Sequence, residues 1–322
     1  MDALEFDGLM EQLQRLSRRQ LVQLREAISR VSRATEVIEL IEAKTEGHPK
    51  CAHCDTTRVY RHGIVNGVQR YRCLSCRRTF NALTGTPLAH LRLKGAWLSY
   101  LQSVLHSTTV RDAAAEVGVH KNTSFRWRHR FLSWAKNDRP VRLHGIAEAD
   151  EAYLLESQKG SRNLDRPARK RGEASKYRGT SSEQVCVLIA RDRTGQTLDF
   201  ITGRGPVSKR QLAHVLPPVL DDDILLVTDS NASYKYFALE HHVSHEAINL
   251  KAGTRVRGAI HVQNVNAYHS RLRGWLHRFH GVATHYLLNY LGWRRGLDSK
   301  RFDSPETLLK ASLGEFPHLA GT

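Results

Sequence analysis

The first 45 residues carry a helical pattern of hydrophobic positions. Six apolar side chains recur at three-, four- and eight-residue steps with Arg and Gln between them, and these are Leu9, Leu13, Leu16, Leu24, Ile28 and Val31. Such spacing is typical of an amphipathic helix. It favours a packing or dimer-forming helical hairpin, and a DNA-contacting helix is the alternative. Gly47, His48 and Pro49 break the pattern and mark a linker, so residues 1–48 form an N-terminal helical region.

The second half of the chain changes to the period of strands. Residues 143–155 read as a strand on which Glu148 and Asp150 share one face and Glu151 takes the other. Carboxylates on a buried strand are costly unless they bind something. The further elements expected are strands at 183–192 and 196–202, a helix within 208–219 that ends near Pro217 and Pro218, a strand at 224–229, a helix at 233–241, a strand at 243–250, and helices at 261–279 and 284–295.

Between these regions lies a short helix, a glycine turn and a basic helix. Thr109 to Val119 has a small-residue face and includes Gly118, and a new helix is expected from about Asn122. This order is typical of a helix-turn-helix whose second helix enters the major groove, although an ordinary helical hairpin has the same outline. The residues expected nearest DNA are Asn122, Thr123, Ser124, Arg126, Arg128 and Arg130.

Charge supports a nucleic-acid partner. The chain has 322 residues and a net charge of +17, and residues 51–142 alone hold 16 Lys/Arg against 4 Asp/Glu. The electrostatic field of a protein with this positive net charge attracts a polyanion such as nucleic acid. No apolar run is long enough to span a membrane and the N-terminus does not resemble a signal peptide, so we expect a soluble, cytoplasmic, nucleoid-associated bacterial protein without a membrane partner.

Four cysteines form two CxxC pairs. Cys51 and Cys54 are followed, after eighteen residues, by Cys73 and Cys76, whereas Cys186 stands alone in an apolar run. This spacing supplies the four thiolates of a structural zinc ribbon, expected over residues 49–82. Two disulfides are the alternative. Arg and aromatic residues interleave along the ribbon, and Arg77 and Arg78 are therefore expected to contact DNA phosphates.

A long basic segment and an isolated aspartate complete the candidate chemistry. Residues 159–178 contain eight Lys/Arg with weak periodicity, which predicts a flexible loop that orders on nucleic acid. Asp229 ends the apolar run that begins at Ile224, where α/β sheets place reactive groups. The alternative is that Asp229 only caps the helix starting near Ser233.

The order of the C-terminal elements is that of the RNase H-like fold of DNA-processing nucleases and transposases. Three sequence motifs also occur in the order found in bacterial insertion-sequence transposases of the ISXO type, which are relatives of the eukaryotic Merlin elements. The motifs are Glu148-Ala-Asp150-Glu-Ala-Tyr153, Val227-Thr-Asp229-Ser230 and the stretch from His261 through Asn266 to Arg273. The chain resembles that family over roughly residues 50–300.

This resemblance implies an α/β, RNase H-like catalytic domain at 141–300 that follows the zinc ribbon and a helix-turn-helix domain at 83–138, with a C-terminal tail at 301–322. It implies that Asp150, Asp229 and Asn266 bind two Mg²⁺ or Mn²⁺ ions for DNA strand cleavage and transfer. Most related transposases have Glu where this chain has Asn266. Arg273 lies two helical turns beyond it and is expected to hold DNA, unless it is a solvated surface residue.

The resemblance further implies binding of double-stranded element ends and target DNA, by a homodimer or larger assembly. The competing function is a catalytically inactive zinc-ribbon and helix-turn-helix DNA-binding regulator derived from a transposase. A plain nuclease is a weaker third interpretation, because it needs no sequence-reading module.

Overall fold

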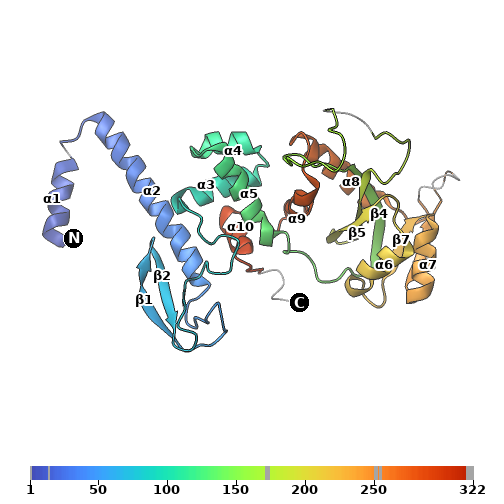
Figure 1. Ribbon diagram of the computed structural model, residues 1–322, viewed down its shortest axis with the longest axis horizontal. Helices are drawn as coiled ribbons and strands as arrows, with labels where there is room; N and C mark the ends of the chain where they lie inside the picture. Colours follow the sequence, from blue (N-terminus) through green and yellow to red (C-terminus); the bar gives the residue numbers. More distant parts are fainter. Residues whose placement is uncertain (1, 14, 171–174, 250–252, 254–255, 317–322) are drawn as a thin grey trace. The chain divides into compact units, whose positions relative to one another are not determined.

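The protein divides into two compact units. A computed structural model describes residues 2–13, 15–170, 175–249, 253 and 256–316. The first unit contains Met1–Trp127 and Ser304–Glu315, and the second contains Arg128–Asp303. No helix in these described ranges is both long enough and apolar enough to cross a lipid bilayer. Figure 1 colours the chain by sequence.

The first unit begins with two helices and a small antiparallel sheet. α1 spans Ala3–Leu13, and α2 spans Arg18–Ala43 behind a capping box made by Ser17. The sheet has the order β1-β2-β3, formed by Val59–Val65, Val68–Cys73 and Thr79–Phe80. Asn66 and Gly67 join β1 to β2 with φ angles of 53° and 80°, which are the left-handed angles that a tight hairpin turn requires.

Three further helices follow a short 3-10 turn, Lys94–Ala96. They are α3, Trp97–Leu105; α4, Val110–Val117; and α5, Lys121–Ala135. Thr109 caps α4, and Gly118 ends it with φ at 70°. The hydroxyl of Ser124 then donates to the carbonyl of Val110 at 2.8 Å, which fixes the start of α5 against α4. A helix, a glycine turn and a second helix are therefore present at the predicted positions.

The end of the chain returns to the first unit. Residues 301–322 were expected to be a tail, but they contain α10, Pro305–Ser312, which Ser304 caps and which packs on α3 and α2. Lys44 donates to the carbonyl of Leu313 at 2.7 Å. The tail interpretation is wrong for this helix because its buried apolar residues complete the core of the unit; residues 317–322 lie outside the described part.

The two units separate within α5 rather than at the predicted turn near residues 137–140. From Arg128 onward, α5 packs within the second unit, where the Arg128 guanidinium lies 5.0 Å from the Trp293 ring centroid. The sequence contains no signal for this division, because a helix can continue unbroken while its packing partners change.

The second unit is built on a five-stranded mixed sheet with the order β6-β5-β4-β7-β8. β4, β5 and β6 pair antiparallel, whereas β7 and β8 run parallel to β4. The strands are Ile146–Leu155, Gln184–Asp192, Thr197–Arg204, Leu225–Asp229 and Ser244–Ile248, from β4 to β8.

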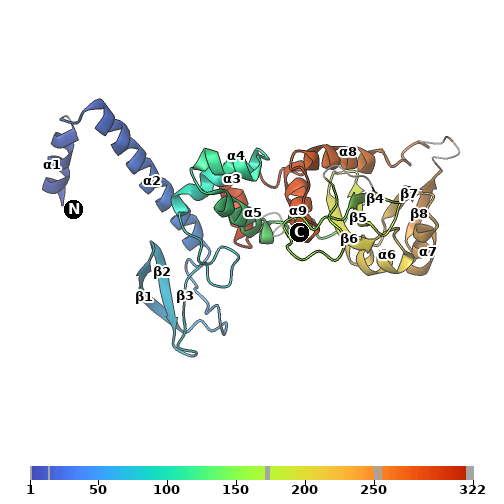
Figure 2. The same cartoon turned by 45° about the horizontal axis from the view of Figure 1, so that its top comes forward.

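Helices cover both faces of this sheet. Figure 2 shows α8 on one face and α6 and α7 on the other. The helices are α6, Lys209–Val215; α7, Ala232–His241; α8, Gln263–His277; and α9, Leu287–Asp298. Short 3-10 turns follow α6 at Pro217–Val219 and precede α9 at Thr284–Tyr286. The element order equals the predicted order, and α6 ends just before Pro217, as expected from the Pro217-Pro218 pair.

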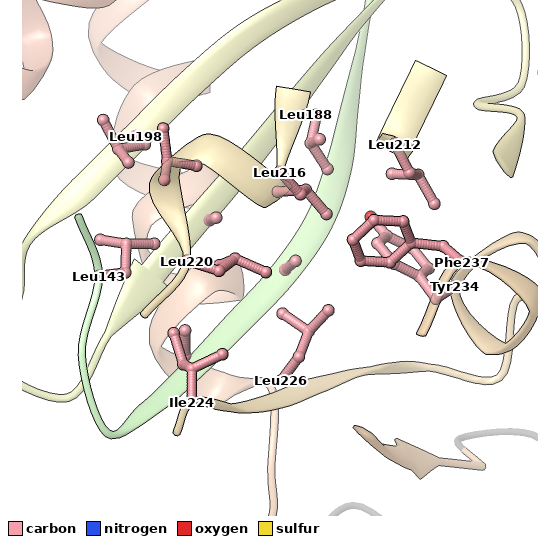
Figure 3. Packing of buried hydrophobic residues seen from close by; sticks show 14 of the residues in the cluster. Leu143, Leu188, Leu198, Leu212, Leu216, Leu220, Ile224, Leu226, Tyr234 and Phe237 are labelled. Atoms are coloured by element: carbon pink, nitrogen blue, oxygen red, sulfur yellow. The ribbon is translucent and has the colours of Figure 1, made fainter. Parts of the chain in front are cut away.

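The core beneath α6 and α7 is aliphatic with two aromatic rings. Figure 3 shows Leu188, Leu212, Leu226, Tyr234 and Phe237 converging there, and all five are fully buried. Burial of each large apolar side chain contributes about 1.5–3 kcal/mol to folding. This core holds β4 and β7 side by side, which fixes the candidate site described next.

Candidate active site

Asp150 and Asp229 lie on adjacent parallel strands. Ala149 of β4 pairs with Thr228 of β7, so the next residue on each strand is one of the two aspartates. Asp229 is the last residue of β7, whereas Asp150 lies in the middle of β4. The two predicted carboxylates are therefore brought to one edge of the central strand pair.

The environment of Asp150 disfavours its charged form. Burial, together with the negative charge of Asp229, outweighs the lowering effects of the Glu151 backbone N–H and the Arg273 charge and raises the pKa of this carboxyl to about 6. When two carboxyl groups lie side by side in a partly desolvated site, a neighbouring cation stabilises their ionised forms. The electrostatics of the pair therefore favour binding of a positive ion.

Asp229 is not the cap of α7. Asn231 is the N-cap, and its side chain accepts from the N–H of Ser233 at 2.9 Å. Asp229 instead accepts from the N–H of Asn231 at 3.0 Å, which turns the chain directly after β7. The capping interpretation of Asp229 is wrong, because the chain provides Asn231 for that task.

α8 lies over the sheet face that carries Asp150, and two of its side chains, His269 and Arg273, interact with that carboxylate. His269 is buried, with its Nδ1 3.5 Å from Asp150 Oδ2. Burial and then the Arg273 charge lower the pKa of His269 to about 4, so its ring is neutral at neutral pH. Asn266 is exposed one turn earlier, and Arg273 is exposed one turn later. Arg273 is thus close enough to Asp150 to act on its ionisation.

Glu148 connects this strand to the start of α8. Its side chain is fully buried, forms an ion pair with Arg193 and accepts from the N–H of Val265 at 2.8 Å. His261 Nδ1 lies 3.3 Å from the same carboxylate. Sequence reasoning placed Glu148 on the face of Asp150 but gave it no role. The strand pattern signals that a buried Glu148 carboxylate needs a partner, but it does not indicate that this partner is the Val265 N–H.

Glu151 faces the opposite side of the sheet, as strand alternation predicted. The hydroxyl of buried Tyr234 in α7 donates to its carboxylate. Burial, together with the charges of Asp150 and Asp229, outweighs the lowering effect of that hydrogen bond and raises the pKa of Glu151 to about 7. The pair ties β4 to α7, the helix that begins just after Asp229.

The donor set around Asp150 suits a hard divalent cation. Asp150 and Asp229 offer carboxylate oxygens, and Asn266 carries an amide oxygen on the nearby helix; Mg²⁺ and Mn²⁺ prefer such ligands. Throughout the described ranges, the only set of three or more Cys, His, Asp or Glu residues with ligand atoms within 4.8 Å of one another is the cysteine set. Within the described residues, the two aspartates therefore belong to no such set.

The four cysteines converge on one point of the first unit. Cys51 and Cys76 have their sulfurs 3.6 Å apart, as do Cys54 and Cys73, and all four sulfurs lie within 4.8 Å of one another. Tetrahedral zinc with bonds of about 2.3 Å requires sulfurs roughly 3.8 Å apart. All four thiols are free, so this cluster is compatible with a zinc ribbon and the disulfide alternative is not present.

Both cysteine turns have the same local geometry. The N–H groups of His53 and Cys76 point to the sulfurs of Cys51 and Cys73 at 3.4 and 3.3 Å. Asp55 and Arg77, one residue beyond each pair, have φ angles of 58° and 61°. These N–H···S contacts favour thiolates, which are the form that binds zinc.

The predicted DNA-contact residues divide into exposed and buried sets. Asn122 and Arg126 are exposed, Thr123 and Arg130 are half-buried, and Arg77 and Arg78 are exposed. Ser124 and Arg128 are fully buried, so their assignment as DNA contacts is wrong. Ser124 bonds to Val110, and the Arg128 guanidinium stacks near the rings of Trp293 and Phe279.

The basic loop is held by protein partners in its described part. Arg166 pairs with Glu156 at 3.0 Å, and Arg169 pairs with Glu183 at 3.4 Å. Lys159 donates to the carbonyls of His280 and Gly281. The expectation that this loop orders only on nucleic acid is wrong for these residues; 171–174 lie outside the described part.

Comparison with known sequences and structures places these features in context. A sequence model of the ISXO2-like transposase domain matches residues 142–294. The uncharacterized protein in transposable element ISH50 of Halobacterium salinarum is 30% identical over 244 residues, which cover 75% of this chain and 82% of that protein.

Two solved structures also match with low similarity. The pre-cleavage Mos1 transpososome has 14% identity and a TM-score of 0.26, with 67% of this chain and 78% of the other covered. The Mos1 strand transfer complex has 15% identity and a TM-score of 0.21, with 66% and 77% covered.

Proposed function

Because this chain belongs to the ISXO2-like family of insertion-sequence transposases, we propose that it binds the terminal inverted repeats of its element, cleaves DNA there and transfers the freed ends to target DNA. The observation that carries the catalytic part of this proposal is the side-by-side placement of Asp150 and Asp229 on paired strands. On this proposal the second unit is an RNase H-like catalytic domain.

Asp150, Asp229 and Asn266 would hold two Mg²⁺ or Mn²⁺ ions through oxygen atoms. When bound, such ions stabilise the attacking and leaving oxygens of an in-line displacement at phosphorus. The amide of Asn266 adds no negative charge, so the bound DNA phosphate supplies more of the charge that the ions need.

Other residues of the site position DNA and the carboxylates. Arg273 is exposed and acts on the ionisation of Asp150, which supports a role in holding a phosphate next to the carboxylates. His269 is neutral and packs against Asp150, so it restricts the orientations of that carboxylate without adding a positive charge that would repel the cations.

The first unit would supply DNA recognition. The zinc ribbon at 49–82 presents Arg77 and Arg78, and the proposed helix-turn-helix within 83–138 presents Asn122, Thr123, Arg126 and Arg130. The zinc ion would be structural, because four thiolates leave no open coordination position. Because two element ends are joined in concert, we propose that a dimer or larger assembly forms on double-stranded DNA.

The experiment uses the full chain with a labelled duplex carrying an element end, and Mg²⁺ or Mn²⁺. Nicked and joined products are expected, and the Asp150→Asn variant should shift the duplex in a gel without cutting it. If the wild-type protein also shifts the duplex but cuts nothing with either ion, the enzyme proposal fails and a DNA-binding regulator derived from a transposase takes its place.

A further inference from the structure

The two N-terminal helices expose a concentrated set of large apolar side chains. In α1, Leu4 is 84% exposed, and Phe6, Leu9 and Met10 are also exposed. In α2, Val31 is 67% exposed, and Leu21, Val22 and Ile28 are exposed with it. Large apolar side chains exposed in this number on two helices that follow one another in the chain indicate an interaction site.

The spacing in α2 is that of a helix that packs on other helices. Leu21, Leu24, Ile28 and Val31 follow one another at steps of three, four and three residues, which is the a/d repeat of helix–helix packing. Further along α2 the packing is already provided, because Val37 and Ile41 are fully buried in the first unit. The unpartnered face is therefore confined to the first half of α2.

The spacing in α1 gives a matching face. Phe6, Leu9, Met10 and Leu13 lie at helical intervals on one side of the helix. With 11 residues, α1 is too short to be stable alone in water, where helices below about 12–15 residues are marginal. Its apolar side needs a partner.

Charge identifies what kind of partner fits. Residues 1–14 contain four acidic residues and no Lys or Arg, whereas residues 15–33 contain six Arg and one Glu. Asp7 and Glu11 are exposed on α1, and Arg18, Arg19 and Arg25 are exposed on α2. An acidic amphipathic helix and a basic amphipathic helix of the same chain are complementary in both charge and apolar spacing.

A fold-back of α1 onto its own α2 would cover only part of the face. Eleven helical residues span about 16 Å, so an antiparallel α1 starting at the linker would extend to about residue 28. Val31 would remain outside that contact. A second copy covers the whole face. Its α2 can pack along the apolar row that runs from Leu21 to Val31 of the first copy, while its α1 packs on another side of the same helix.

We propose that α1 of one copy packs against the first half of α2 of a second copy, reciprocally, so that two chains form a four-helix N-terminal dimer. The interface consists of the apolar seams of both helices, flanked by the acidic residues of α1 and the arginines of α2. It forms without DNA and without the catalytic metal, so it is independent of the proposed function.

The test uses two charge-reversed full-length chains. The first carries Asp7→Arg and Glu11→Arg, and the second carries Arg18→Glu and Arg25→Glu. Each variant alone sets like charges against each other across both α1–α2 contacts. Mixing the two restores opposite charges at both contacts of a heterodimer but at no contact within one chain.

Sedimentation velocity and native mass spectrometry at low salt, without DNA, give the readout. The wild-type chain should be dimeric at micromolar concentration, each variant should dimerise at least tenfold more weakly, and the mixture should yield a one-to-one heterodimer. Ile28→Asp with Val31→Asp should also give monomers, whereas Leu239→Asp on exposed α7 should stay dimeric. Zinc content and circular dichroism confirm that each variant is folded.

Three results would overturn the proposal. The first is a wild-type chain that stays monomeric throughout this concentration range. The second is a pair of reversed chains that remain homodimers on their own, since dimerisation would then use another surface. The third is a mixture that forms no heterodimer, which would assign the complementary charges to a contact within one chain.

Discussion

Glu148 Oε2 lies 2.8 Å from the backbone nitrogen of Val265 and accepts its hydrogen bond. Glu148 precedes Asp150 by two residues, and Val265 directly precedes Asn266. The N-cap residue of α8, Val262, makes no side-chain capping bond, so the buried carboxylate takes the place of a cap for the first turn. One hydrogen bond thus sets the separation between the strand and the helix that carry the proposed ligands.

Replacement of Glu148 should therefore impair cleavage without weakening DNA binding. Glu148→Ala leaves Arg193 without its anionic partner and the Val265 N–H without an acceptor, and the cost should be about 2–4 kcal/mol of stability. Glu148→Gln retains an acceptor and should retain more activity. Cleavage rates, gel shifts and melting curves separate these effects; wild-type cleavage by the alanine variant would remove Glu148 from any positioning role.

Asn266→Ala should reduce strand transfer severely while DNA binding stays near the wild-type level. The amide would be the third oxygen ligand, and an alanine offers none. His269→Ala is the matched comparison, because His269 is the other α8 side chain next to Asp150. Titration of strand transfer with Mn²⁺ distinguishes them: the Asn266 variant should need more metal. Normal transfer by that variant, together with loss in the His269 variant, would move the ligand role to the histidine.

Cys73→Ser should remove bound zinc and the order of the ribbon. Three thiolates hold a structural ion much less tightly than four, and the small β1-β2-β3 sheet has few other buried residues. Zinc content by atomic absorption should fall well below one ion per chain, and affinity for the element end should fall with it. Cys186→Ser is the control, since this buried thiol lies in the second unit, and its zinc content should be unchanged.

Arg126 and Arg128 should behave in opposite ways when changed to alanine. Arg126 is exposed, so its loss should weaken DNA binding with little change in thermal stability. The slope of log K for DNA binding against log salt concentration should become shallower by about one. Arg128 is buried against Trp293, so its loss should lower the melting temperature. Equal effects of both variants on the salt dependence would contradict this distinction.

Asp298 should make stability depend on acid pH. Burial opposes its ionisation, but the hydrogen bond from Arg271 and the charge of Arg191 outweigh this and hold its pKa below the ordinary value. The stability contribution is therefore full above the unfolded pKa of about 3.9 and is lost as pH falls through the lower folded pKa. Asp298→Asn should cost about 2–3 kcal/mol at pH 7. Urea unfolding at pH 7 and pH 3 should show this difference shrinking; a constant difference would exclude the linkage.

The sequence predicted the order of the second unit well because strands and helices differ in hydrophobic period. Alternation alone placed Glu148 and Asp150 on one face and Glu151 on the other. The sequence pattern of α5 could not assign Ser124 and Arg128 correctly, since the buried side of a basic helix depends on which elements pack against it. For Arg128 that neighbour is Trp293, which lies more than 150 residues away along the chain.

The role of Glu148 was out of reach for a related reason. Its acceptor function depends on a backbone N–H of α8, and a backbone group carries no signature in the sequence. Asn266 was accessible only through the family motif, because an exposed asparagine on a helix has no distinctive spacing. Local pattern thus identifies elements and faces, whereas long-range pairing decides which polar residues serve the site.

The return of α10 to the first unit has a consequence for synthesis of the protein. α10 packs on α3 and α2, so the unit proposed to read DNA lacks part of its core until residues 304–315 have emerged from the ribosome. A chain that stops early, for example after an interruption of the coding sequence, would lose that helix along with any missing catalytic residues. Such fragments should be poorly folded and prone to degradation, which limits the chance that a truncated copy occupies element ends and blocks the intact protein.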